Sequence, residues 1–498
     1  MTDSNEPGRE AKSVDSAMVR GAAWMVSMRW SIRAIGLVNT VILARLLTPE
    51  DFGIVAMAMI VVGLLTELAE TNVEIALIRN RNADRADYDS AWTMKILTGA
   101  LITGGLFAAA PFAAGYFGDD RVEIVIQIVA LRALILGFEN IGVVDFRRNL
   151  QFGLDFRYGV FRRLSLFVIA LGIAFALRDY RALAIAAPLS AVLTVGLSYY
   201  MSSYRPRFCV SRLRGLWSFS QWLMVDHACR FISERVDQFV IGGLAGASRL
   251  GHYYMASEVS AMPTREVIVP AGRALIPTFA KLAHDAAASR RAFVNVVGIQ
   301  ALYAFPAGFG MSVVAADLVP ILLGAQWVGA VPFFQWLGIH AAFEAFILGL
   351  RPYFMARDGE RAFALTSLCH MLLLVPSIAL AGHLQGIEAV AITRTGVTAG
   401  FVLIVIMVAT RMGFANLSAF FAILWRPLSA AVTMWFAVRY LHDSDIEFAV
   451  LSLLRDVAIG GGVFAGALLG LWFVSGRPEG AERATIDFVA RRLKRSSP

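Results

Sequence analysis

Apolar segments of about 20 residues recur from one end of the chain to the other, and this recurrence limits the possible folds most. Such a segment crosses a bilayer as a helix, because a helix pairs all of its own backbone polar groups. Of the 498 residues, 58% are hydrophobic and 16% are charged, so a soluble fold has no place for this apolar surface. The sequence predicts an all-α polytopic membrane protein with about 14 transmembrane helices. We expect spans near residues 18–46, 52–78, 91–116, 122–144, 156–177, 182–201, 217–244, 251–275, 293–314, 331–354, 362–381, 387–409, 417–438 and 448–474.

Lysine and arginine gather in alternate connections between these spans. The connections near 79–85, 147–157 and 205–214 are rich in arginine, whereas 315–330 and 382–386 contain neither residue. Basic connections stay in the cytoplasm. We therefore expect both termini in the cytoplasm, which agrees with an even number of spans.

The stretch 38–58 is repeated weakly as 236–256. Without a gap, Val38 pairs with Val236, Leu46 with Leu244 and Gly53 with Gly251. Apolar helices also resemble one another by chance, but weak internal symmetry is typical of transporters built from two related halves. An even number of spans separates the copies, which predicts two six-helix lobes related by a pseudo-two-fold axis along the membrane normal.

These observations predict the organisation of the whole chain. It comprises a cytoplasmic N-terminus (1–17), an N-lobe (18–203), a cytoplasmic linker (204–216), a C-lobe (217–410), two appended helices (411–475) and a basic cytoplasmic tail (476–498).

Four ionisable residues follow one face of the predicted span 217–244. They are Asp226, Arg230, Glu234 and Asp237, which form a stripe along the helix. Arg235 lies off this stripe. The stripe can pair with itself and hold the helix against a neighbour, or it can line a water-filled cavity. We favour a cavity between the lobes, because ionisable groups at membrane depth are expensive unless they are paired or wet.

Other ionisable residues within the spans complete two groups of candidates. Guanidinium groups carry a fixed charge and a fork suited to phosphate, so the basic group is expected to bind an anionic substrate. Its members are Arg29, Arg33, Arg230, Arg265 and Arg394. Carboxylates in a low-dielectric site can bind and release protons or sodium near neutral pH, so the acidic group is expected to couple transport to an ion. Its members are Glu67, Glu70, Asp226, Glu234, Asp237 and Glu258, while Glu139, His340 and Glu344 lie at similar depth without an assigned role.

The sequence lacks the motifs of several enzyme and metal-site classes. It has no GxxxxGK[ST] loop for ATP and no HExxH zinc motif, and its three cysteines have no metal-ligand spacing. The glycines at 242, 243 and 246 are interpreted as a close-packing cluster. The connections are too short for a catalytic domain, and the net charge of +8 fits arginines that anchor loops at anionic lipid. We expect no catalytic residue, no cofactor, no metal site and no nucleic-acid partner.

Three segments resemble a known transporter family. They read ILARLLTPEDFGIVAMA (42–58), DQFVIGGLAGASRLGHYYMA (237–256) and PTREVIVPAGRALIPTFAKL (263–282). They are similar to the polysaccharide-transporter branch of the multidrug/oligosaccharidyl-lipid/polysaccharide exporter superfamily, especially to Wzx-type flippases of the colanic-acid-exporter kind.

The resemblance implies a flippase that works by alternating access in the bacterial cytoplasmic (inner) membrane. Its substrate would be an undecaprenyl-pyrophosphate-linked oligosaccharide, the repeat unit of an O-antigen, capsule or exopolysaccharide, moved with the help of an ion gradient. Expected partners are this substrate, membrane lipids, and the polymerase and chain-length proteins of the same pathway. The alternative is a cation-coupled exporter of drugs or small metabolites on the same fold.

Overall fold

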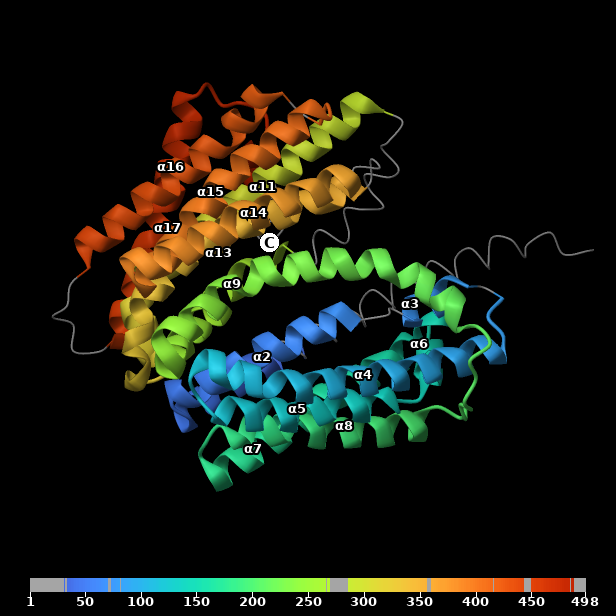
Figure 1. Ribbon diagram of the computed structural model, residues 1–498. Coiled ribbons are helices and arrows are strands. Elements are labelled where there is room, and N and C mark those ends of the chain that lie inside the picture. Colours follow the sequence, from blue (N-terminus) through green and yellow to red (C-terminus); the bar gives the residue numbers. More distant parts are fainter. Residues whose placement is uncertain are drawn as a thin grey trace, which may run out of the picture. The chain divides into compact units, whose positions relative to one another are not determined.

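The computed structural model describes residues 31, 34–69, 73–80, 82–265, 267–268, 285–355, 360–414, 416–442, 449–483 and 485–487. Within these ranges the regular structure is helical, as Figure 1 shows. The first group of elements is α2 (Pro49–Ala69), α3 (Val73–Arg79), α4 (Arg85–Phe117), α5 (Arg121–Gly137), η1 (Ile141–Val143), α6 (Val144–Arg148), α7 (Phe152–Leu177) and α8 (Arg181–Met201). The second group is α9 (Leu213–Ser260), α11 (Ala286–Val313), α12 (Ala315–Leu322), η2 (Ala325–Ala330), α13 (Val331–Met355), α14 (Glu360–Gln385), α15 (Ile387–Arg411), α16 (Leu417–Leu441) and α17 (Ala449–Val474).

Ten helical stretches in the described part of the chain are long and apolar enough to cross a membrane. The bent pair 121–137 and 141–148, with an angle of 72° between its halves, would make an eleventh span. Each of these eleven stretches coincides with one predicted span. The other three predicted spans, 18–46, 217–244 and 251–275, include residues or side chains outside the described part. The membrane-spanning helical fold is therefore confirmed, whereas the count of 14 stays a prediction.

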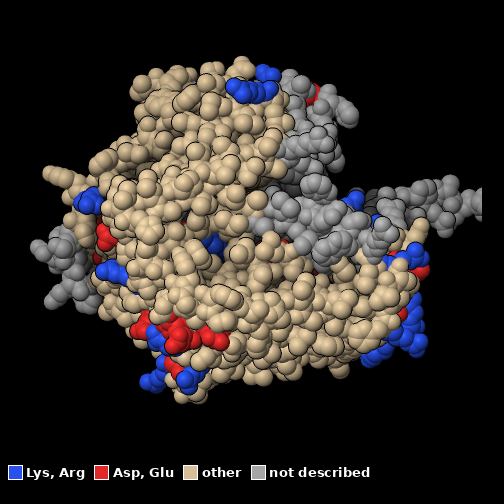
Figure 2. Space-filling model, in the orientation of Figure 1, with Lys and Arg blue, Asp and Glu red and all other residues tan. Residues whose placement is uncertain are grey.

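The outward faces of these helices are apolar. Most of the surface that Figure 2 shows is uncharged, and the charged side chains gather in a few groups. On α4, Leu101 and Phe112 are 69% and 79% exposed, and on α7 Val168 is 58% exposed. Large side chains this exposed suit contact with lipid and not with water.

The chain divides into two compact units, residues 1–231 and 232–498. In the first unit, α5 packs against α2, α4 and α8, and α7 packs against α8. In the second unit, α11 packs against α13 and α16, α15 against α13 and α14, and α17 against α16. The division falls inside α9, so the predicted linker 204–216 belongs to the first unit by this measure, and the predicted lobe symmetry stays a prediction.

An aromatic cluster forms much of the core of the second unit. Phe293 of α11 lies 4.1 Å from Tyr353 of α13, measured between ring centroids, and 5.6 Å from Phe420 of α16. Phe414, which follows α15, stacks edge-on against Tyr353 at 4.6 Å. Rings at these separations add to the burial of apolar area, so the cluster ties three helices and one loop together.

Both copies of the sequence repeat contain a break between two helices. In the first copy, the helix Ala34–Leu46 ends before α2 begins at Pro49. In the second copy, α9 bends at Gly246, whose φ of 75° and ψ of −176° are not helical. The pairing of the repeat places Gly246 opposite Thr48, so the two breaks coincide.

Different local chemistry produces the two breaks. Thr48 begins α2 with a capping box: its hydroxyl accepts the Asp51 N–H at 3.2 Å, and the Asp51 carboxylate accepts the Thr48 N–H at 2.9 Å. Apart from its chain neighbours, Gly246 has no atom of the described residues within 4 Å of the position that a Cβ would take. Its role is therefore to supply positive φ, and the interpretation of Gly246 as part of a close-packing cluster is wrong.

We expect the substitution Gly246→Ala to destabilise the protein by about 1–3 kcal/mol, because this region of φ/ψ space is almost restricted to glycine. The check is the thermal unfolding midpoint of the detergent-solubilised protein. The matched control is Gly396→Ala in α15, where a Cβ also meets nothing within 4 Å and the backbone is helical. Equal midpoints for the two variants would contradict the assignment of strain to Gly246.

Candidate functional site

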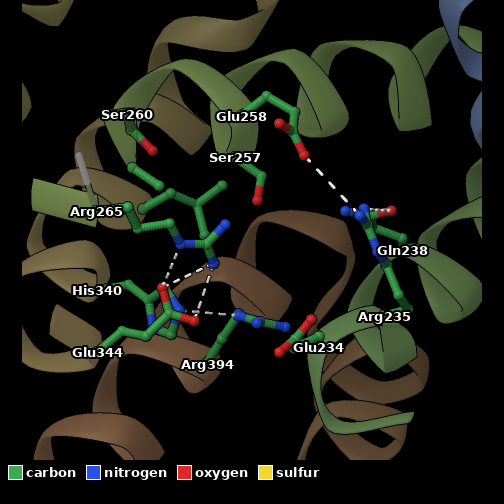
Figure 3. A pocket seen from close by; sticks show the side chains of 12 residues that line it. Glu234, Arg235, Gln238, Ser257, Glu258, Ser260, Arg265, His340, Glu344 and Arg394 are labelled. Carbon is green, nitrogen blue, oxygen red and sulfur yellow. Dashed lines mark hydrogen bonds and ion pairs between the residues drawn. The ribbon is translucent and has the colours of Figure 1, made fainter. Parts of the chain in front are cut away.

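The second unit contains a narrow polar pocket between α9, the short helical turn after it, α13 and α15 (Figure 3). Ten of its twelve lining residues are polar or charged, and the exceptions are Ala261 and Leu337. Its free volume is about 20 Å³, enough for a single water molecule. Among the lining residues are three arginines and three glutamates, which fill the space by pairing with one another or with neighbours.

Arg265 and Glu344 form the most regular of these pairs. The Arg265 Nε lies 3.1 Å from Glu344 Oε2, and Nη2 lies 3.0 and 2.8 Å from the two carboxylate oxygens. This fork-to-carboxylate geometry is the one that a guanidinium also offers to a phosphate. The Arg265 side chain is 38% exposed, so it can reach a ligand as well as its partner.

A second pair is completely enclosed. Arg394 Nη1 lies 2.7 Å from Asp237 Oδ2, and the two side chains are 7% and 1% exposed. The Tyr253 hydroxyl donates to the same carboxylate oxygen. Tyr253 follows the break at Gly246, so the bend in α9 brings the second half of the helix back to Asp237 on the first half.

His340 links this pair to the rest of the pocket. Its Nε2 accepts a hydrogen bond from Arg394 Nε at 3.2 Å, so the ring is neutral and its proton is on Nδ1. This Nδ1 is buried and has no hydrogen-bond partner among the described residues. A second proton on the ring would break the bond from Arg394. His340 and Glu344 are one helical turn apart on α13, which places both side chains in the pocket.

A looser contact lies at the other side of the pocket. Arg235 donates to Gln238 at 2.9 Å and lies 3.9 Å from Glu258, while Ser257 and Glu234 face the same space in Figure 3. With Asp237 behind Arg394, the pocket and its wall carry four carboxylates against three guanidiniums. Inside the pocket, this balance and the small volume suit a proton or a small cation, whereas a larger anion would have to bind from outside, at the partly exposed Arg265.

The first unit has its own buried ionic network. Lys95 of α4 lies 2.9 Å from Glu139 and 3.3 Å from Glu74, and the Tyr158 hydroxyl donates to Glu139. Arg147 lies 3.5 Å from Glu74 on its more exposed side. Of these residues only Glu139 is among the charges predicted at membrane depth, although Lys95 lies within the predicted span 91–116 and the same rule applies to it.

The structure brings five of the predicted residues together in the second unit. Glu234, Glu258, Arg265 and Arg394 line the pocket, and Asp237 is bound to Arg394. Arg230 is exposed in the first unit, and Glu67 is partly buried there. Arg29, Arg33 and Glu70, and the side chain of Asp226, lie outside the described residues.

Three further ionisable residues line the pocket and belong to neither predicted group of site residues. His340 and Glu344 were noted only as charges at depth, although their spacing of four residues on an apolar helix is a usable signal. Arg235 was placed off the charged stripe, yet it lines the pocket because a long arginine side chain reaches around its helix. Tyr253 carries no signal in the sequence, since its contact with Asp237 depends on the bend.

One group in the described part of the chain has ligand atoms close enough together to hold a metal ion. Atoms of Asp317, His442 and Asp456 lie within 4.8 Å of one another. Protein partners already engage this group, because Ser452 donates to Asp317 at 3.0 Å and Arg455 lies 3.2 Å from Asp456.

Comparison with known proteins gives matches over most of the chain. A family model described as polysaccharide biosynthesis protein matches residues 42–332, more than half of the sequence. The lipopolysaccharide biosynthesis protein WzxC of Escherichia coli is 21% identical, and the match covers 79% of this chain and 80% of WzxC. The succinoglycan biosynthesis transport protein ExoT of Rhizobium meliloti is 25% identical over 93% of this chain and 94% of ExoT. Among solved structures, the lipid II flippase MurJ in an inward closed conformation has a TM-score of 0.74 at 12% identity, over 92% of this chain and 100% of MurJ, and so has the same fold.

Proposed function

The chain belongs to the polysaccharide biosynthesis protein family, and on this premise we propose that it is a flippase for a lipid-linked oligosaccharide. The substrate would be the undecaprenyl-pyrophosphate-linked repeat unit of an O-antigen, capsule or exopolysaccharide. The protein moves it from the inner to the outer leaflet of the bacterial cytoplasmic membrane by alternating access. The proposal is supported by the name of ExoT as a succinoglycan biosynthesis transport protein, by that of WzxC as a lipopolysaccharide biosynthesis protein, and by the fold that the chain shares with the lipid II flippase MurJ.

One observation carries the proposal beyond family membership. Arg265, which is 38% exposed, presents a guanidinium fork within a unit whose helices are built to lie in lipid. Packing alone does not require ionisable groups at membrane depth. A phosphate that replaces Glu344 on this fork would be held by two parallel charge-assisted hydrogen bonds. We assign Arg29, Arg33, Arg230 and Arg394 to the same substrate-binding group.

We propose that the acidic members of the pocket couple transport to an ion. Glu234 and Glu258 line the space that a proton or a small cation would occupy, and Asp237 is reached through Arg394. Release of Glu344 from Arg265 would leave this carboxylate free to bind a cation, so arrival of phosphate and uptake of a cation favour each other. Glu67, Glu70 and Asp226 are assigned to the same role.

The topology predicted from the sequence is part of this proposal. It includes 14 spans, two six-helix lobes with two appended helices, and both termini in the cytoplasm. Arginine-rich connections support this orientation. The polymerase and chain-length proteins of the pathway would receive the substrate on the outer side.

Deletion of the gene, followed by chemical analysis of cell-surface polymers and of lipid extracts, tests the function. We expect one polymer to disappear and its lipid-linked repeat unit to accumulate, with recovery on expression of the wild-type chain. An unchanged polymer profile together with a new sensitivity to drugs would instead favour the cation-coupled exporter of small molecules.

A further inference from the structure

A second cavity lies within the first unit, and the proposed function does not use it. It has a volume of about 280 Å³ and lies among α5, α6, α7 and α8. It is more than ten times larger than the space in the pocket of the second unit. Ligand pockets for drug-sized molecules begin near 300 Å³, so this cavity accommodates a head group and not a whole lipid-linked oligosaccharide.

The cavity is strongly basic. Four arginines line it: Arg132 from α5, Arg147 from α6, and Arg162 and Arg163 from α7. Among the described residues of the lining, Asp155 is the only carboxylate, and Arg147 binds it at 3.1 Å. The lining therefore has a formal charge of +3, in contrast to the pocket of the second unit.

Two of the four guanidiniums form no ion pair in the described part of the chain. Neither Arg132 nor Arg162 has a carboxylate within 4.0 Å there. The nearby Glu139 is already bound by Lys95 at 2.9 Å and by the Tyr158 hydroxyl. The two arginines face one cavity with like charges, an arrangement that is unfavourable without an anion between them.

The rest of the lining leaves the guanidiniums as the available donors. The Ser190 hydroxyl donates to the Ala187 carbonyl at 2.9 Å, and the Thr194 hydroxyl donates to the Ser190 carbonyl at 2.8 Å. The Tyr158 hydroxyl is used by Glu139. An anion in the cavity would thus be bound by N–H groups of Arg132 and Arg162, whose planar forks match the oxygens of a phosphate.

We propose that this cavity is a second anion site, which binds the diphosphate head group of the lipid-linked substrate. The proposal rests on the proposed function for the identity of the lipid. In the predicted orientation Arg147 lies at a cytoplasmic connection, so the cavity is on the side from which the substrate is loaded. Pairing with the diphosphate would neutralise charges that the unit otherwise keeps uncompensated near the membrane.

Binding to the purified full-length protein tests the site. The probes are inorganic pyrophosphate, undecaprenyl diphosphate and phosphatidylglycerol, and the variants are Arg132→Gln, Arg162→Gln and the control Arg157→Gln. Arg157 is on α7 like Arg162 but does not line the cavity. We expect the dissociation constant for undecaprenyl diphosphate to rise at least about tenfold in the first two variants, as loss of one charge-assisted hydrogen bond implies, and to stay unchanged in the control.

The thermal unfolding midpoint of the variants distinguishes a role of Arg132 and Arg162 in binding from a role in supporting the fold. Because Arg132 and Arg162 repel each other without a ligand, we expect their glutamine variants to unfold at the same temperature as the wild type or higher. A lower midpoint, or equal binding by Arg162→Gln and Arg157→Gln, would overturn the site. Phosphatidylglycerol that competes as well as undecaprenyl diphosphate would overturn the assignment to the substrate. A gene deletion without effect on any polymer would refute the proposed function while leaving the measured binding intact.

Discussion

Replacing Arg394 by leucine is expected to destabilise the protein by about 3–5 kcal/mol, because the change leaves a buried charge without its partner. Asp237 is 1% exposed, and its carboxylate lies 2.7 Å from Arg394 Nη1. The Tyr253 hydroxyl remains as a donor to Asp237 in the variant, but a hydroxyl does not neutralise a carboxylate. His340 would lose the donor to its Nε2 as well.

Thermal unfolding of the solubilised protein measures this effect. Arg411→Leu, at the exposed end of the same helix, is the control and should change stability by about 0.5 kcal/mol or less. The double variant Asp237→Asn with Arg394→Leu should recover much of the loss, since it removes both charges together. A single Arg394→Leu variant as stable as the wild type would show that the pair does not hold α9 and α15 together.

Replacing Arg265 by alanine is expected to reduce flipping at least about tenfold, equivalent to one charge-assisted interaction with the substrate. Arg265 offers three contacts of 2.8–3.1 Å to Glu344 and is exposed enough to exchange them for a phosphate. Arg265→Lys keeps the charge but loses the fork, so we expect it to restore only part of the activity. The readout is the initial rate at which lipid-linked repeat units reach the outer leaflet.

Two further variants distinguish substrate binding from support of the fold. Arg249→Ala removes an exposed arginine of α9 and should leave the rate unchanged. Glu344→Gln breaks the ion pair but leaves the Arg265 guanidinium available. We therefore expect this variant to bind diphosphate as tightly as the wild type or more tightly, even if transport slows. If Arg265→Ala flips substrate at the wild-type rate, Arg265 is not a substrate ligand. If Glu344→Gln and Arg265→Ala weaken diphosphate binding equally, the Arg265–Glu344 ion pair supports the fold of the site and Arg265 does not bind the substrate directly.

The amino-acid sequence was sufficient to predict the positions of the helices but not which side chains pair between helices. Length and hydropathy place eleven of the predicted spans, because a bilayer demands both properties locally. Helical spacing was also enough to place Glu234 and Asp237 near one region of α9. By contrast, Arg394 and Asp237 are far apart in the chain, and no periodicity indicates that they pair.

The arginine-lined cavity shows the same limit. Arg132 lies in the middle of the predicted span 122–144, so the rule for charges at membrane depth applies to it, but Arg132 and Arg162 lie on different helices and no sequence spacing relates them. The two arginines line one cavity only because α5 and α7 both pack against α8. Rules based on spacing within a helix miss sites of this kind.

The bend at Gly246 has a consequence for chirality. A φ of 75° with a ψ of −176° is the mirror image of an extended conformation that ordinary L-residues adopt with ease. A D-amino acid would therefore fit this position as well as glycine does, whereas each of the other encoded residues is strained there. The genetic code offers only one achiral residue, so a chain that bends this way needs glycine at 246 whatever molecule it carries.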